Sequence, residues 1–185
     1  MQTRQYMKEI SLDVLRHKAN NIKWFFSDVD GTLTDGGVYY SSEGECLKRF
    51  SLKDGTGFFL LRQAGIKVGI ITGEDSPIVA QRAKKLNVDK YLCGSHKKVE
   101  ALESFLKEEN LSLDEIAYIG DELNDVKLIN KCGFGFAVGD ADHRVKSAAL
   151  YVCKQNGGRG AFREAVEQLF VLRQIDIDGI VEKSL

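Results

Sequence analysis

The chain has 185 residues, of which 26 are basic and 27 acidic, and its formal net charge at pH 7 is -1. Because this balance produces no strong positive field, we do not expect the protein to bind nucleic acid. The length suits a single domain that buries its own core. The four cysteines form no CxxC pair, so we expect buried, reduced thiols rather than a zinc knuckle or a redox motif.

The N-terminal stretch is interrupted by charges every few residues. It has no apolar core of signal-peptide length, and no later run approaches the length of a membrane span. We therefore expect a cytoplasmic protein that has no membrane partner. Met7, Ile10, Val14 and Leu15 recur at roughly helical spacing, which predicts an amphipathic helix within residues 4–20, packed outside the main fold.

From Ile22 onward, short apolar runs alternate with helical patterns. The runs that we interpret as strands are KWFFSD, KVGIIT, KYLCG, IAYIGD, FGFAVGD and LYVC. Between them, the spacing of apolar residues predicts helices in SPIVAQRAKKL and KKVEALESFLKEE. This alternation predicts an α/β fold with a Rossmann-like, doubly wound parallel sheet that helices cover on both faces.

One segment, GGVYYSSEGECLKRFSL, interrupts the alternation after the first strand. It has β-prone runs on either side of Ser42, Glu43 and Gly44, which predicts a hairpin over about residues 37–50 that protrudes near the end of that strand. No Gly- or Pro-rich linker occurs, so the sequence leaves no place for a second large domain.

Polar side chains follow three of the predicted strands at their carboxyl ends. Asp28 and Asp30 follow the first, Thr72 follows the second, and Asp121 and Asp125 follow a third. Ligands bind at these ends in doubly wound sheets, and carboxylates that converge there repel one another unless a cation lies among them. Since no His or Cys is near, the oxygen donors point to Mg²⁺.

Lys98 begins the predicted helix that follows KYLCG, where its ammonium group can reach the strand ends. Carboxylates, a magnesium ion, a hydroxyl, a lysine and helix N-termini together describe a phosphoryl-transfer centre. Each element alone has a simpler structural explanation, because Asp commonly caps turns and GDELND can cap the helix that follows it. Their joint occurrence, each at a strand end or helix start, indicates a functional site.

At these positions the sequence resembles the haloacid dehalogenase superfamily of phosphohydrolases. The matching motifs are DVDGT, Thr72, Lys98 and GDELND, and they span most of residues 22–125. The resemblance implies that Asp28 is the nucleophile and forms an aspartyl-phosphate. It implies that Asp30 protonates the leaving alcohol and then activates water.

The same resemblance assigns the remaining residues of the motifs. It implies that Mg²⁺ is held by Asp28, the carbonyl of Asp30, and Asp121. It implies that the phosphoryl group is bound by Thr72, Gly73 and Lys98, and that Lys98 is oriented by Asp125.

Within the superfamily, the chain is similar to capless members such as KDO 8-phosphate phosphatase. The shared features are the hairpin, the segment Lys53-Asp54-Gly55 and the segment NGGRGAFRE. The resemblance implies a homotetramer in which the hairpin and the GGRG segment complete active sites across interfaces. The implied organisation is a helical extension over 1–21, a phosphatase domain over 22–172 and a C-terminal tail over 173–185.

The implied substrates are phosphorylated 2-keto-3-deoxy sugar acids, whose carboxylate needs a cation. The candidates for that contact are Arg159 and Lys53. The segment TGE with Glu74 is similar to that of the phosphatases for nine-carbon KDN and sialic acid 9-phosphates. Lys85, one helical turn after Arg82 and on a shared face with it, also matches this type, and both are candidate substrate residues. We therefore expect a nine-carbon acid, and a KDO 8-phosphate phosphatase of lipopolysaccharide synthesis is the alternative.

Two other classes of protein gather similar residues. A signalling receiver module also places acidic residues, a Thr and a Lys around a phosphorylated Asp, but it lacks the second Asp of the DxD pair. A non-catalytic scaffold would not need all four motifs. Asp30 therefore favours an enzyme, and the absence of a cap favours a phosphatase over a phosphomutase.

Overall fold

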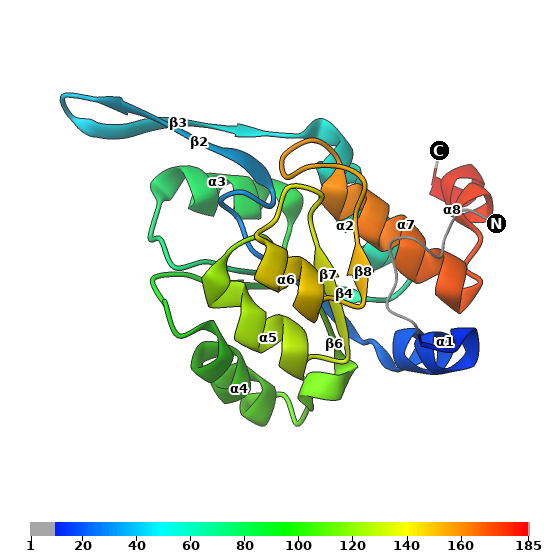
Figure 1. Cartoon of the computed structure of the whole chain (residues 1–185). Coiled ribbons are helices and arrows are strands. Elements are labelled where there is room, and N and C mark those ends of the chain that lie inside the picture. The colour runs from blue at the N-terminus through cyan, green and yellow to red at the C-terminus, as the bar shows by residue number, and fades with distance from the viewer. Residues whose placement is uncertain (1–9, 185) are drawn as a thin grey trace.

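The computed structural model describes residues 10–184 and shows an α/β fold with one six-stranded parallel sheet (Figure 1). The strand order is β5-β4-β1-β6-β7-β8. The bounds of these strands are β1 Trp24–Ser27, β4 Lys67–Ile71, β5 Lys90–Leu92, β6 Ile116–Gly120, β7 Phe134–Ala137 and β8 Tyr151–Val152. Each predicted strand is present, and the order reverses beside β1, so the prediction of a doubly wound sheet is confirmed.

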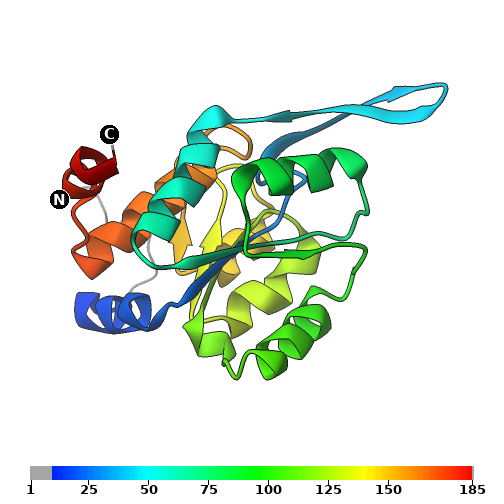
Figure 2. The same ribbon diagram turned by 180° about the vertical axis from the view of Figure 1, so that it is seen from behind.

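Helices cover both faces of the sheet. Their bounds are α1 Leu12–Asn21, α2 Leu52–Gln63, α3 Pro77–Leu86, α4 Lys98–Glu108, α5 Val126–Lys131, α6 His143–Ala148, α7 Ala161–Arg173 and α8 Ile177–Ser184. Helices α1, α2 and α7 pack together on one side of the sheet, and α4, α5 and α6 lie on the other (Figures 1 and 2). Such two-sided cover is what buried parallel strands require.

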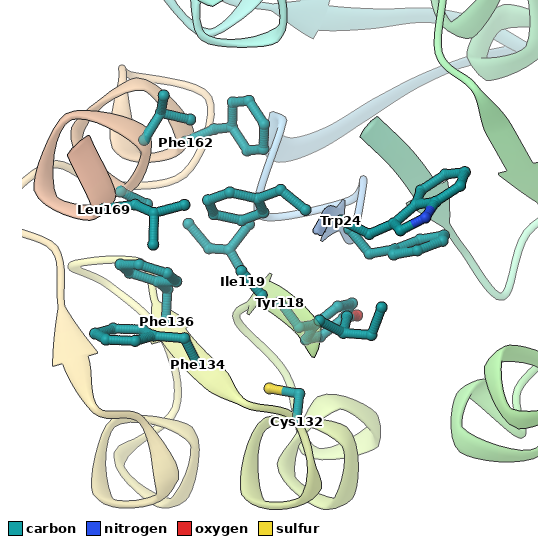
Figure 3. Close-up of a cluster of buried hydrophobic side chains, with 14 of the residues drawn as sticks. Trp24, Tyr118, Ile119, Cys132, Phe134, Phe136, Phe162 and Leu169 are labelled. Atoms are coloured by element: carbon teal, nitrogen blue, oxygen red, sulfur yellow. The ribbon is translucent and has the colours of Figure 1, made fainter. Parts of the chain in front are cut away.

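Aromatic side chains fill the space between the sheet and the helices (Figure 3). Phe25 of β1 stacks on Phe136 of β7 with ring centroids 5.3 Å apart, and Phe58 of α2 stacks on Phe162 of α7 at 4.3 Å. All four rings are fully buried. These contacts fix the middle of the sheet, from whose strand ends the polar residues project.

The hairpin consists of β2 Thr34–Ser41 and β3 Gly44–Phe50, and it extends well beyond the rest of the domain (Figures 1 and 2). At its base Thr34 pairs with Phe50, three residues before the expected start. The prediction of a protruding hairpin is therefore confirmed, with a longer first strand.

The expected packing of the N-terminal helix is wrong. Helix α1 begins at Leu12, with Ser11 as its N-cap, and it contacts α7. Leu15 and Ala19 are buried in the main core, whereas Val14 is exposed. The helix belongs to the core because Leu15 and Ala19, one turn apart, form the packed face; Met7 lies outside the described residues.

Cys132 and Cys153 are buried as expected, but Cys46 and Cys93 are exposed, because one lies on the hairpin and the other on a surface loop. In the C-terminal segment, Ile177 and Ile180 of α8 pack against the core.

Among the described residues, no helix has the length and apolar character needed to span a membrane.

Candidate active site

The register of the sheet brings the polar residues together. Ser27 pairs with Ile70 of β4 and with Ile119 of β6, so the three strands end side by side. Asp28, Thr72 and Asp121 follow within two residues of these pairs. The convergence expected from the sequence is therefore what the strand register produces.

A fully buried lysine lies at the centre of the site. The Nζ atom of Lys98 is 2.7 Å from Oδ1 of Asp28 and 2.7 Å from Oδ1 of Asp125. Burial opposes the charge on the ammonium group, but these two carboxylates outweigh it, and the pKa of Lys98 is raised above its ordinary value. Lys98 is thus held as a cation against the candidate nucleophile.

Asp125 has partners on both of its oxygens. Its Oδ1 accepts a hydrogen bond from the hydroxyl of Tyr118 at 2.6 Å as well as from Lys98. Its Oδ2 accepts from the backbone amides of Asp121 at 3.0 Å and Glu122 at 3.2 Å. This arrangement fixes the position of Asp125, and through it that of Lys98.

Tyr118, which no sequence motif marks, also belongs to the site. It lies in the middle of a buried strand, and its hydroxyl is also 3.3 Å from Nζ of Lys98. A tyrosine within an otherwise apolar strand is a usable signal, because a buried hydroxyl needs a hydrogen-bond partner.

Carboxylate oxygens of Asp28, Asp121 and Asp125 all lie within 4.8 Å of one another. Burial, together with the charge of Asp125, raises the pKa of Asp28 to about 7. Burial, together with the charge of Asp28, raises the pKa of Asp121 to about 8. Such a set of oxygen donors fits a hard divalent cation, and Asp28 and Asp121 are the better donors because both oxygens of Asp125 already accept hydrogen bonds from the protein.

The turn that follows β1 is shaped around this cluster. Gly31 has a positive φ of 82°, and a Cβ at this position would collide with the carboxylate of Asp121. Thr32 donates a hydrogen bond to Oδ1 of Asp121 at 2.8 Å. A glycine is therefore required for Asp121 to approach the turn that carries Asp28 and Asp30.

Asp30 is bound by a lysine that the sequence analysis did not identify. Nζ of Lys48, from the hairpin strand β3, is 2.8 Å from Oδ1 and 2.9 Å from Oδ2 of Asp30. Nothing in the sequence separates this lysine from a solvated hairpin residue, because the contact depends on how the hairpin leaves the domain.

Thr72 and Gly73 lie where β4 ends. Thr72 is buried, and its Oγ1 accepts a hydrogen bond from the backbone amide of Glu74 at 3.3 Å. A Cβ at Gly73 would lie 2.8 Å from Nδ1 of His96, so the loop after β4 touches the loop that leads to Lys98.

The KDG and GGRG segments contact each other within one chain. The carboxylate of Asp54, which is buried, accepts hydrogen bonds from the backbone amides of Gly160 at 3.2 Å and Arg163 at 3.0 Å. The amide of Gly158 donates to the carbonyl of Thr32 at 2.9 Å. The C-terminal glycine segment therefore packs against the chain's own nucleophile turn.

The candidate substrate residues are placed differently from one another. Glu74, Lys85, Lys53 and Arg159 are exposed. Arg82 is half-buried; it donates to the carbonyl of Ser51 at 3.0 Å and lies over the ring of Phe50. These two contacts of Arg82 hold α3 against the start of α2.

Known proteins that are similar to this chain are phosphatases, in agreement with the geometry of the site. The family model described as haloacid dehalogenase-like hydrolase matches residues 94–163. The chain is 38% identical over 155 residues to the 3-deoxy-D-manno-octulosonate (KDO) 8-phosphate phosphatase KdsC of Haemophilus influenzae, which covers 84% of this chain and 86% of that protein. It is 37% identical over 176 residues to KdsC of Escherichia coli K12, covering 95% and 93%.

Two solved structures are similar over most of the chain. One is the KDO 8-phosphate phosphatase of Moraxella catarrhalis in complex with magnesium, phosphate and KDO, with a TM-score of 0.87, 36% identity and coverage of 95% of this chain and 100% of that one. The other is the cobalt-bound phosphatase of Haemophilus influenzae, with a TM-score of 0.83, 36% identity and coverage of 89% and 98%.

Proposed function

Because this chain belongs to the haloacid dehalogenase-like hydrolases, as a capless KdsC-like phosphatase and thus a phosphoric monoester hydrolase, we propose that it cleaves a phosphorylated 2-keto-3-deoxy sugar acid through an aspartyl-phosphate on Asp28. The observation that carries this proposal is the buried contact of Lys98 with Asp28 and Asp125. A cation held against a carboxylate at a strand end is suited to bind the phosphoryl group as it approaches that carboxylate.

The reaction would proceed in two steps. A carboxylate oxygen of Asp28 attacks phosphorus, the bond from phosphorus to the sugar oxygen breaks, and Asp30 gives its proton to the departing oxygen. Water then loses a proton to Asp30 and attacks the same phosphorus, which releases phosphate and restores the Asp28 carboxylate. Asp30 ends each cycle as it began.

The other motif residues bind and orient. Thr72, Gly73 and Lys98 would hold the phosphoryl oxygens, and Asp125 keeps Lys98 in place. Asp28, Asp121 and the carbonyl of Asp30 would hold Mg²⁺, which fits the oxygen-only donor set. When bound, this ion supplies positive charge that offsets the charge of the transferring phosphoryl group.

For the substrate, we propose KDO 8-phosphate. The support is that the similar phosphatases of Haemophilus and Escherichia are named for it and that the Moraxella structure contains KDO. These names lend no support to the nine-carbon acid expected from the sequence. Arg159 and Lys53 would bind the sugar carboxylate; Lys53 lies beside Gly160, next to Arg159 in the chain.

One observation keeps a nine-carbon acid as a second candidate. Glu74 is exposed two residues after Thr72, where its carboxylate is available to accept hydrogen bonds from the hydroxyls of a longer sugar tail. Arg82 and Lys85 would contribute to the same recognition, Lys85 from an exposed position on α3.

We also propose a homotetramer in which the hairpin of one chain reaches a neighbour's site, whereas the glycine segment packs on the nucleophile turn of its own chain. Tyr39, Tyr40 and Leu47 are 62%, 72% and 61% exposed on the hairpin. A two-stranded ribbon with apolar side chains is marginally stable when it stands alone, so packing against another copy would stabilise it.

Phosphate release from a panel of phosphate esters tests the proposed activity. The panel contains KDO 8-phosphate, KDN 9-phosphate, N-acetylneuraminate 9-phosphate and a hexose 6-phosphate, each with Mg²⁺ and with a chelator. We expect the highest kcat/KM for KDO 8-phosphate and no turnover by Asp28→Asn. Preference for a nine-carbon ester would support the role of Glu74 instead, and full activity of Asp28→Asn would overturn the mechanism.

A further inference from the structure

The base of the hairpin is tied to the active site by one side chain. Both carboxylate oxygens of Asp30 lie within 2.9 Å of Nζ of Lys48. The side chain of Lys48 is 1% exposed, although the hairpin that carries it projects into solvent. A lysine whose side chain is covered in this way on a two-stranded ribbon does not serve solubility.

Lys48 is itself held by further contacts. Its Nζ is 3.3 Å from Oε2 of Glu45, three residues earlier on β3, and the other oxygen of Glu45 accepts a hydrogen bond from the hydroxyl of Ser76. Ser76 is buried and precedes α3, in the loop that follows Thr72. A continuous chain of contacts therefore runs from Asp30 through the hairpin to the phosphate-binding loop.

We propose that Lys48 is the positioning residue of Asp30: it fixes the carboxyl group of Asp30 at the point where the sugar oxygen leaves phosphorus. This proposal rests on the proposed role of Asp30 as proton donor and acceptor. It extends that role to the hairpin, because the hairpin delivers the group that sets the orientation of Asp30.

Two features of the geometry support a positioning role. An aspartate side chain turns about two bonds, and contacts to both of its oxygens restrain both rotations. Asp30 is also set apart from Asp28, Asp121 and Asp125, whose oxygens form the close cluster. Lys48 thus holds the side chain of Asp30 toward the hairpin, whereas the backbone carbonyl of Asp30 stays with the proposed cation donors.

The proposed role of Lys48 matters most in the step in which the sugar oxygen leaves phosphorus. When Asp30 passes its proton to the departing alkoxide, a carboxylate remains, and the adjacent ammonium group of Lys48 compensates its charge. A phosphate ester whose leaving group is a stable anion needs no proton at this stage. The fall in kcat/KM that follows removal of Lys48 should therefore depend strongly on the leaving group. A general loss of stability would lower kcat/KM for all substrates alike.

The test compares kcat/KM for a sugar phosphate, which leaves as an alkoxide, with kcat/KM for p-nitrophenyl phosphate, which leaves as a stabilised phenolate. For Lys48→Met we expect a loss of about 10- to 100-fold on the sugar phosphate and less than about threefold on p-nitrophenyl phosphate. Lys48→Arg, which keeps a cation with several donors, should recover most of the loss. The matched control is Lys131→Met, which removes an exposed lysine 3.1 Å from Glu103 and should change neither value.

Asp30→Asn separates failure of this inference from failure of the proposed function. If Asp30→Asn shows the leaving-group dependence and Lys48→Met does not, Lys48 does not position Asp30. If neither shows it, Asp30 is not the proton donor. Equal losses on both substrates for Lys48→Met, at an unchanged Tm, would also overturn the inference.

A second variant guards against misfolding. Should Lys48→Met not fold, Glu45→Gln removes the charge that holds Lys48 from the other side while it preserves the shape of the side chain. We expect the same dependence on leaving group at a smaller amplitude. A uniform loss, or none, would contradict the positioning role.

Discussion

Nζ of Lys98 lies 2.7 Å from Oδ1 of Asp28, and both side chains are buried. An ion pair excluded from water contributes little net stability, but each partner becomes costly when the other is removed. The contact therefore makes a prediction about folding as well as about catalysis.

Replacing Lys98 with methionine should lower both the stability and the activity of the protein. The substitution leaves the carboxylates of Asp28 and Asp125 without their shared cation, so we expect a loss of about 3 kcal/mol in the free energy of unfolding. Activity should fall by at least about 100-fold because the phosphoryl group loses its cation. Urea unfolding and phosphate release measure the two effects, and a variant with unchanged stability and activity would contradict the geometry.

Tyr118→Phe should have a smaller, specific effect. The variant removes the hydroxyl that donates to Asp125 and lies beside Lys98, which should cost about 1 to 2 kcal/mol of stability. We expect kcat to fall by about fivefold or more, since Lys98 becomes less well oriented. Tyr151→Phe, which removes a hydroxyl bonded to Glu164, is the control: a comparable fall in its kcat would mean that the effect of Tyr118 is not local.

The affinity for Mg²⁺ should rise with pH. The pKa values of Asp28 and Asp121 are raised to about 7 and about 8, so protons compete with the cation for these oxygens near neutral pH. Both groups bind their protons more tightly in the folded than in the unfolded chain, so they destabilise the metal-free protein progressively as the pH rises toward 8. Titration calorimetry between about pH 6 and pH 8.5 should show tighter binding and fewer released protons at the higher pH; a constant affinity would refute this coupling.

Asp54 should anchor the glycine segment to α2. Asp54→Ala leaves the buried amide of Gly160 and the part-buried amide of Arg163 without their acceptor, and we expect the free energy of unfolding to fall by about 2 kcal/mol. Hydrogen exchange should accelerate at residues 157–163 before it does in β1. Asp54→Asn, which retains one acceptor oxygen, should lose less; equal losses in both variants would argue against this anchoring.

The hairpin should determine the oligomeric state. Replacement of Tyr40 and Leu47 with serine removes exposed apolar surface from the ribbon, and we expect the tetramer to dissociate in light scattering coupled to size-exclusion chromatography. Val171→Ser, on exposed surface of α7, is the matched control. A tetramer that survives the hairpin variant would place the interface elsewhere, and a monomeric wild type would refute the assembly itself.

The sequence was informative where local chemistry and strand order coincide. Asp28, Thr72 and Asp121 follow apolar runs, and the alternation of strands and helices predicted a parallel sheet in which these strand ends converge. The register that places Ser27 between Ile70 and Ile119 brings them together. Long-range side-chain contacts were not accessible in this way. Lys48 and Asp30 are 18 residues apart and meet only because of the path of the hairpin.

The packing of the N-terminal helix α1 could not be predicted from the sequence either. Apolar spacing located the N-terminal helix, but the face that packs depends on where α7 lies, and Leu15 with Ala19 makes the contact instead of Val14. The link from Asp54 to Gly160 joins two segments 106 residues apart, and resemblance indicated both segments without the bond between them.

Formation of the aspartyl-phosphate is most directly tested by mass spectrometry of the Asp30→Asn variant. We would mix this variant with Mg²⁺ and p-nitrophenyl phosphate, which needs no proton donor, and quench with acid. We predict one added phosphoryl group per chain, located on Asp28, because the base that hydrolyses the intermediate is missing. Turnover of the ester with no adduct, or an adduct on another residue, would contradict Asp28 as the nucleophile.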